Sequence, residues 1–138
     1  MGEVSVSRTF DATPADLRRA MDDIEAFMQG AQFDEVSYDG DTLVIDNSVG
    51  LFDIELVLDV VDADGAALAY EQREGVFESM DTEYSVESDD GGTTVTARTE
   101  FTTTELAVVG TVLDETVVHR QRRKELTAQF DWLADRVE

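Results

Sequence analysis

The sequence predicts an α+β fold in which an antiparallel sheet wraps around one long C-terminal helix. Two observations support this prediction. Six segments between residues 33 and 101 have the alternating apolar pattern of short strands, and the apolar face that they would form needs a cover. The stretch from Val108 to Val137 is the only predicted element long enough to provide that cover.

The N-terminal part of the chain predicts one strand and one short helical region. The strand runs from Val4 to Phe10 and alternates in polarity. Thr13 is the expected N-cap of the helix, because its hydroxyl can accept a hydrogen bond from a free backbone N–H, and Pro14 suits the first helical position. Gly30 is expected to end this helix, whose apolar stripe consists of Leu17, Met21, Ile24 and Met28.

The middle of the chain predicts six strands, which with the first strand make a seven-stranded antiparallel sheet. Turn residues separate the segments, most clearly at 39–40, 62–65 and 89–92. The segment from Phe52 to Val60 alternates so regularly that one face is expected to be buried and the other exposed. The expected strands are 33–38, 43–49, 52–60, 68–73, 76–86 and 93–101.

The C-terminal helix carries an apolar stripe with one polar interruption. Its C-terminal half has an apolar stripe at helical spacing, formed by Leu126, Phe130, Leu133 and Val137. His119, the only histidine in the chain, lies about 20° from Leu126 on a helical wheel and is therefore expected to point toward the sheet. Toward the N-terminus of the helix, the same face becomes apolar again at Val112 and Val108. Such a face predicts either a satisfied internal polar cluster or the wall of a cavity.

The composition bounds the class of protein. A length of 138 residues without a linker-like stretch predicts one domain over residues 1–138. Cysteine is absent, which excludes disulfides, thiolate metal sites and a cysteine nucleophile. No window approaches the roughly 20 apolar residues of a membrane span, and the first residues lack the pattern of a secretory signal, so a cytoplasmic location is expected.

The chain is strongly acidic, with a net charge of −22 from 32 acidic and 10 basic residues. Nine of the basic residues are arginine and only Lys124 is lysine, a composition typical of proteins adapted to concentrated salt. Stability is therefore expected to rise with salt, since screening reduces the repulsion among carboxylates. Nucleic acid is an unfavourable partner, because its phosphates would be repelled almost everywhere.

Three stretches carry a resemblance to a known family: Arg8–Leu17, Tyr70–Gly75 and Val118–Leu126. In these, and in its order of elements, the chain resembles the START-like or helix-grip (SRPBCC) superfamily, which includes polyketide cyclase/dehydrase-like proteins, coenzyme-Q-binding proteins and the birch-pollen allergen group. The resemblance implies a seven-stranded sheet around the last helix, with a cavity between them for lipids, quinones, polyketides or similar molecules. It implies no shared catalytic motif.

Strand parity nominates the polar residues of such a cavity. Gln72 shares its parity with Leu68 and Tyr70, and Glu78 shares its parity with Met80, so both polar side chains are expected to point inward near the turn at Gly75. A buried Glu78 would need a partner, for which His119 and Arg120 are the candidates. The expected ligand-binding residues are Tyr70, Gln72, Glu78, Met80, His119, Arg120 and Arg123.

The basic run from Arg120 to Lys124 has two interpretations. It could form ion pairs with acidic sheet edges, or one arginine could turn inward and hold a carboxylate or phosphate of a ligand. Arg120 is the candidate if the upper helix buries Val109, Leu113 and Val117. Arg123 is the candidate if the lower stripe determines the buried face.

The leading functional hypothesis is the binding of a small hydrophobic or amphipathic ligand. The alternatives are a cyclase or dehydratase using His119 and Glu78 as an acid/base pair, and a non-catalytic interaction module whose cavity is too small for a ligand. A cavity well below about 300 Å³ would favour the last. No metal or other cofactor is expected, and Trp132 is expected at the cavity rim or at a homodimer contact.

Overall fold

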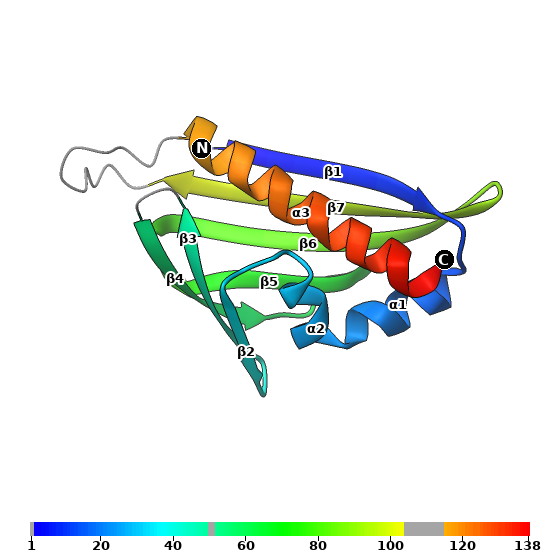
Figure 1. Ribbon diagram of the computed structural model, residues 1–138, viewed down its shortest axis with the longest axis horizontal. Helices are drawn as coiled ribbons and strands as arrows, with labels where there is room; N and C mark the ends of the chain where they lie inside the picture. Colours follow the sequence, from blue (N-terminus) through cyan, green and yellow to red (C-terminus); the bar gives the residue numbers. More distant parts are fainter. Residues whose placement is uncertain (1, 50–51, 104–114) are drawn as a thin grey trace.

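A computed structural model describes residues 2–49, 52–103 and 115–138 of the chain, and it confirms the α+β class with a seven-stranded antiparallel sheet and a long C-terminal helix (Figure 1). The elements in chain order are β1 (Gly2–Phe10), α1 (Pro14–Asp22), α2 (Ile24–Gln29), β2 (Glu35–Asp39), β3 (Thr42–Val49), β4 (Phe52–Val60), β5 (Ala66–Glu74), β6 (Phe77–Asp89), β7 (Gly92–Thr103) and α3 (Glu115–Val137).

The sheet has the strand order β1-β7-β6-β5-β4-β3-β2, so that the first strand pairs with the last and every neighbouring pair is antiparallel. Figure 1 shows α3 crossing one face of this sheet, with α1 and α2 beside its C-terminal half. The helix packs mainly along β1 and against α1 and α2. The expected start of the helix at Val108, with Val109, Val112 and Leu113, lies outside the described residues.

The first helical region is two helices rather than the single one expected. Thr13 is the N-cap, as predicted, and its hydroxyl accepts a hydrogen bond from the backbone N–H of Asp16 at 3.1 Å. Asp23 then leaves the helical conformation, with ψ of 71°, and separates α1 from α2. The apolar stripe gives no sign of this break, because its residues on both sides of Asp23 contact the core. Gly30 ends α2, as predicted.

The C-terminal half of α3 supplies the centre of the apolar core, as its apolar stripe predicts. Leu126, Phe130 and Leu133 are buried against the sheet. The ring of Phe130 meets that of Phe10 edge to face, with centroids 6.0 Å apart. This contact joins the last helix to the first strand.

The face of the sheet that points away from α3 carries a row of carboxylates. Strand register places Asp59 opposite Glu71, Glu71 opposite Asp81, Asp81 opposite Glu100, and Glu100 opposite Glu3. Like charges that are directly opposite one another destabilise a sheet. The row therefore concentrates part of the repulsion expected from the net charge of −22 on five adjacent strands.

Two arginines neutralise the ends of this row but not its centre. Arg73 donates hydrogen bonds to both carboxylate oxygens of Asp59, and Arg98 bridges Glu3 and Glu100. No ion pair reaches Asp81 within the described part of the chain. Partial burial raises the pKa of the Asp81 carboxyl, and the nearby carboxylates of the row raise it further.

Among the described helices, none combines the length and the apolar character that a bilayer crossing requires.

Truncation of Phe130 to alanine should lower the free energy of unfolding by about 3–5 kcal/mol, because it removes a buried aromatic ring and leaves a cavity. Denaturant titration measures the change, and alanine at the adjacent exposed Asp131 is the control for helix propensity. A change near zero for Phe130→Ala would show that the sheet does not hold α3 tightly.

Replacement of Asp81 by asparagine should raise the melting temperature at neutral pH in dilute buffer. The folded-state pKa of Asp81 is raised, so protonation stabilises the fold, and this stabilisation is complete below the unfolded pKa and lost as the pH rises through the folded pKa. The advantage of Asp81→Asn should therefore disappear in acid, where the wild-type carboxyl is also neutral. It should also shrink in molar potassium chloride, where the Debye length falls to about 3 Å.

The control for this variant is Glu87→Gln, which removes the same charge from an exposed position of β6 outside the row. Thermal melting over pH and salt compares the two. Equal effects of Asp81→Asn and Glu87→Gln would mean that only the total charge matters and that the row has no special role.

Candidate functional site

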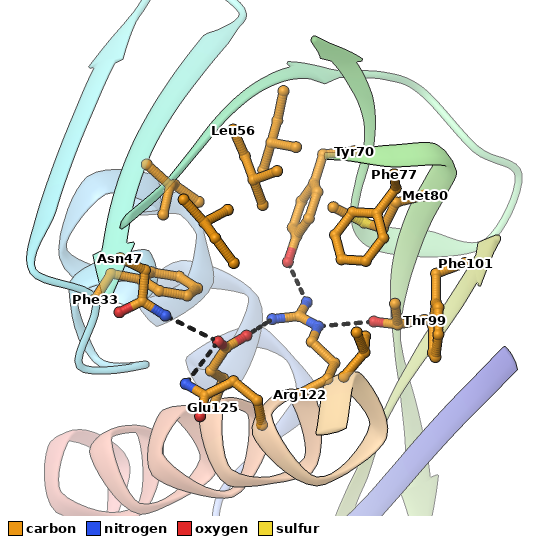
Figure 2. A pocket seen from close by; sticks show the side chains of 15 residues that line it. Phe33, Asn47, Leu56, Tyr70, Phe77, Met80, Thr99, Phe101, Arg122 and Glu125 are labelled. Carbon is orange, nitrogen blue, oxygen red and sulfur yellow. Dashed lines mark hydrogen bonds and ion pairs between the residues drawn. The ribbon is translucent and has the colours of Figure 1, made fainter. Parts of the chain in front are cut away.

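A mostly apolar pocket lies between the sheet and the N-terminal half of α3, at the end of the molecule where β3 and β4 approach the helix (Figure 2). Its volume is about 60 Å³. The apolar part of the wall comes from Phe33, Ile45, Ile54, Leu56, Leu58, Tyr70, Phe77, Met80, Phe101 and Val118, and the polar part from Asn47, Thr99, Gln121, Arg122 and Glu125.

Arg122 is the centre of the polar part. It is 8% exposed and points from α3 toward the sheet. Its Nε donates a hydrogen bond to the Thr99 hydroxyl at 2.9 Å, and its Nη2 donates to the hydroxyls of Tyr70 and, at 3.2 Å, Thr82. One guanidinium thus bridges three neighbouring strands, β5, β6 and β7.

Glu125 neutralises this buried charge from one turn further along α3. Its Oε1 accepts a hydrogen bond from Arg122 Nη1 at 3.0 Å. Its Oε2 accepts one from Gln121 Nε2 at 3.1 Å and one from Asn47 Nδ2 at 3.3 Å. The carboxylate therefore connects α3 to β3 across the pocket, as the dashed lines of Figure 2 show.

A chain of hydrogen bonds continues from this pair into the core. The Tyr84 hydroxyl donates to Gln129 Oε1 at 2.6 Å and lies 3.2 Å from the Tyr70 hydroxyl, while Gln129 Nε2 donates to the backbone oxygen of Phe27 at 3.3 Å. Since Tyr84 gives its proton to Gln129, Tyr70 must donate to Tyr84. All donors therefore point the same way, from Arg122 to the end of α2.

The electrostatics of the cluster favour one charge state. Burial works against the guanidinium charge, but attraction to Tyr70, Tyr84 and Glu125 outweighs this effect and raises the pKa of Arg122. Burial also raises the pKa of Tyr84 well above its usual value, with Tyr70 adding to the shift. Around neutral pH the cluster thus holds a charged Arg122 beside a neutral Tyr84 hydroxyl, with Glu125 as the ion-pair partner of the arginine.

Two of the residues nominated from the sequence, Tyr70 and Met80, line the pocket, and a third lies close to it. Gln72 points inward as expected, but its amide accepts a hydrogen bond from the Phe77 N–H at 3.2 Å and donates one to the Phe77 carbonyl at 2.8 Å. It thereby closes the hairpin between β5 and β6. A Cβ atom on Gly75 would lie 2.3 Å from Gln72 Oε1, so a larger residue in this turn would require the Gln72 side chain to shift.

The prediction that Glu78 points inward is wrong, because the strand changes register beside it. The pairing of β6 with β7 shifts between Phe77 and Ser79, and a bulge of this kind reverses which side chains face the core. Phe77 therefore takes the inward position and lines the pocket, whereas Glu78 is exposed. The sequence prediction assumed that inward and outward side chains alternate regularly along the strand before Met80, and such a pattern cannot reveal a register shift.

His119, Arg120 and Arg123 are exposed, so the prediction that His119 points inward is also wrong. The buried face of α3 changes along the helix. The C-terminal part buries the stripe that begins at Leu126, whereas the N-terminal part buries Val118 and Arg122. His119 lies at the edge of that face and forms no hydrogen bond with Glu78 in the described structure. One arginine of the basic run does turn inward, but it is Arg122 rather than Arg120 or Arg123.

Arg122 and Glu125 were not nominated from the sequence, although a signal for them exists. Val118, Arg122, Glu125 and Gln129 follow one another at spacings of four, three and four residues, which places them on one face of a helix. Inward-facing threonines on β6 and β7 supply matching hydroxyls on the sheet. A prediction of the buried face from apolar periodicity misses this stripe, because it considers only hydrophobic residues.

Removal of one partner of the Arg122–Glu125 pair should be costly. Arg122→Met leaves a buried carboxylate without its cation and should lower the free energy of unfolding by about 3–5 kcal/mol. The double variant Arg122→Met, Glu125→Met should be less destabilised than Arg122→Met alone, because no uncompensated charge remains. Denaturant titration of the set measures this coupling, and additive losses would contradict a tightly paired cluster.

No protein-family model matches the sequence, and a search of curated proteins finds no relative. Solved structures do match over nearly the whole chain. The Zhui aromatase/cyclase from Streptomyces aligns with a TM-score of 0.76 and 18% identity, over 99% of this chain and 96% of that one.

Two further structures align similarly. The protein TTHA0849 from Thermus thermophilus has a TM-score of 0.75 and 17% identity, and a START superfamily protein from Mycobacterium smegmatis has a TM-score of 0.72 and 16% identity. Each alignment covers 98% of this chain and 96% of the other. At these identities the likeness concerns the fold. With its seven-stranded sheet, its short helices after β1 and its long last helix, the chain has the START-like helix-grip fold.

Proposed function

We propose that this protein binds a small hydrophobic or amphipathic molecule in the pocket between the sheet and α3. The observation that supports this most directly is the composition of the pocket wall. Apolar side chains from the sheet form most of it, and most of the polar groups come from α3 and β3, with Thr99 of β7 beside them. Pockets of this composition bind apolar ligands and use a few polar groups to orient them.

The volume of the pocket requires that it widen when a ligand enters. About 60 Å³ is room for a few water molecules, whereas ligand pockets commonly measure about 300–1,000 Å³. The wall formed by β3 is the part best able to move. The helix packs along β1, α1 and α2, whereas among the described residues its hydrogen bond to β3 is the one from Asn47 to Glu125.

The small volume also favours a second candidate function, that of an interaction module without a ligand. In that case the Arg122 cluster would serve only to fix α3 on the sheet. A cyclase or dehydratase activity has less support, because His119 and Glu78, the pair nominated for acid/base catalysis, are both exposed and do not interact with each other. The Streptomyces aromatase/cyclase is similar to this chain in fold, but the described wall of the pocket contains no histidine.

Filling the pocket should abolish the binding of an uncharged apolar fluorescent probe. Ile54 lines the pocket from β4, and Ile54→Trp should occupy its volume, so that probe fluorescence no longer saturates at one molecule per chain. The matched control is Val57→Trp, which places the same side chain on the opposite face of the same strand. Thermal melting confirms that both variants fold.

Saturable binding by the wild type and by Val57→Trp, but not by Ile54→Trp, is the expected result. A wild-type protein that binds no probe at any salt concentration would favour the interaction module. Equal binding by both tryptophan variants would place the probe somewhere other than this pocket.

A further inference from the structure

The polar side of the pocket offers an anion no paired contact with Arg122, even though this arginine is its central residue. Arginine normally holds a carboxylate or phosphate with two parallel N–H groups. In Arg122 the Nε and Nη2 groups donate to Thr99, Tyr70 and Thr82, and Nη1 donates to Glu125. The edges of the guanidinium that could form such a paired contact are already occupied.

Glu125 adds a second obstacle to an anionic ligand. Its carboxylate is buried, lines the pocket and balances the charge of Arg122, so the pair has no net charge. A ligand carboxylate brought into this apolar space would lose its hydration without gaining a free cation, and it would be repelled by Glu125. The exposed cations Arg120, Arg123 and Lys124 do not line the pocket.

The donors around Glu125 show which polar group the pocket can accept. A carboxylate only accepts hydrogen bonds and has about four acceptor sites. Arg122, Gln121 and Asn47 each donate one hydrogen bond to Glu125, which lines the pocket, so an acceptor site of this carboxylate remains free. A hydroxyl group can donate to that site, whereas an ionised carboxylate cannot.

We propose that the pocket selects an uncharged amphiphile with a hydroxyl head group, such as an alcohol or a phenol, and rejects carboxylates and phosphates. The Arg122–Glu125 pair excludes anions, and the Glu125 carboxylate accepts the hydrogen bond of the hydroxyl group. This inference rests on the ligand-binding function proposed above and specifies the class of ligand. The net charge of −22 acts in the same direction, because it repels anions before they reach the pocket.

The test compares octanol with octanoate, which share a chain length and differ in charge. Binding is measured by chemical-shift titration at neutral pH in molar potassium chloride, where the field of the surface charges is screened. The wild type should bind octanol about tenfold or more tightly than octanoate, because burial of an unpaired carboxylate costs at least that much. Glu125→Gln keeps an acceptor for Arg122 but leaves its charge unbalanced, so octanoate should gain about tenfold or more.

A second variant and a control keep the result interpretable. Gln121→Arg adds a cation beside an intact Arg122–Glu125 pair and should also strengthen octanoate binding, which covers the case in which Glu125→Gln does not fold. Glu87→Gln removes one carboxylate far from the pocket and should leave the preference for octanol unchanged.

The outcomes separate the two proposals. A wild type that binds octanoate as well as octanol overturns the selectivity but leaves ligand binding in place. Folded Glu125→Gln and Gln121→Arg variants that still reject octanoate also overturn it. Binding of neither molecule by the wild type rejects the proposed function, and the selectivity with it.

Discussion

The burial of the Arg122 guanidinium is the constraint on which the packing of α3 against the sheet depends. A charge in an apolar interior is tolerated only where a counter-charge and hydrogen-bond acceptors surround it. Here the counter-charge comes from the same helix and the acceptors from three neighbouring strands, and the donors continue through Tyr70, Tyr84 and Gln129 to the backbone of Phe27. None of the buried side-chain nitrogen or oxygen atoms of the described structure lacks a partner. Any shift of α3 would break several of these bonds at once, so the cluster fixes the helix above the sheet.

The two faces of the sheet manage charge in opposite ways. Toward α3, one cation and one carboxylate cancel inside an apolar wall. On the other face, carboxylates stand opposite one another across five strands, and arginines balance only the ends of the row. The first arrangement hardly responds to salt because it is buried, whereas the second is exposed and easily screened. Salt should therefore act on the stability of the sheet without changing the electrostatics of the pocket.

Much of the fold was determined by local sequence patterns. Each of several elements could be predicted from its own residues, independently of the rest of the chain. These predictions came from the alternation in β4 and β7, the turn residues between strands, the Thr13 cap and the apolar stripe around Phe130. The same patterns correctly placed Tyr70 and Met80 on the inner face. Local periodicity works for these residues because each belongs to a regular stretch of strand or helix.

Only the tertiary structure decided the polar site. A register shift beside Glu78 turned it outward, and the changing contact of α3 with the sheet exposed His119 while it buried Arg122. Neither event leaves a mark on hydrophobic periodicity. The partners of Arg122 on the sheet are 23, 40 and 52 residues away along the chain. Whether a buried arginine is tolerable depends on such distant groups, which meet only when the sheet has formed and the helix lies across it.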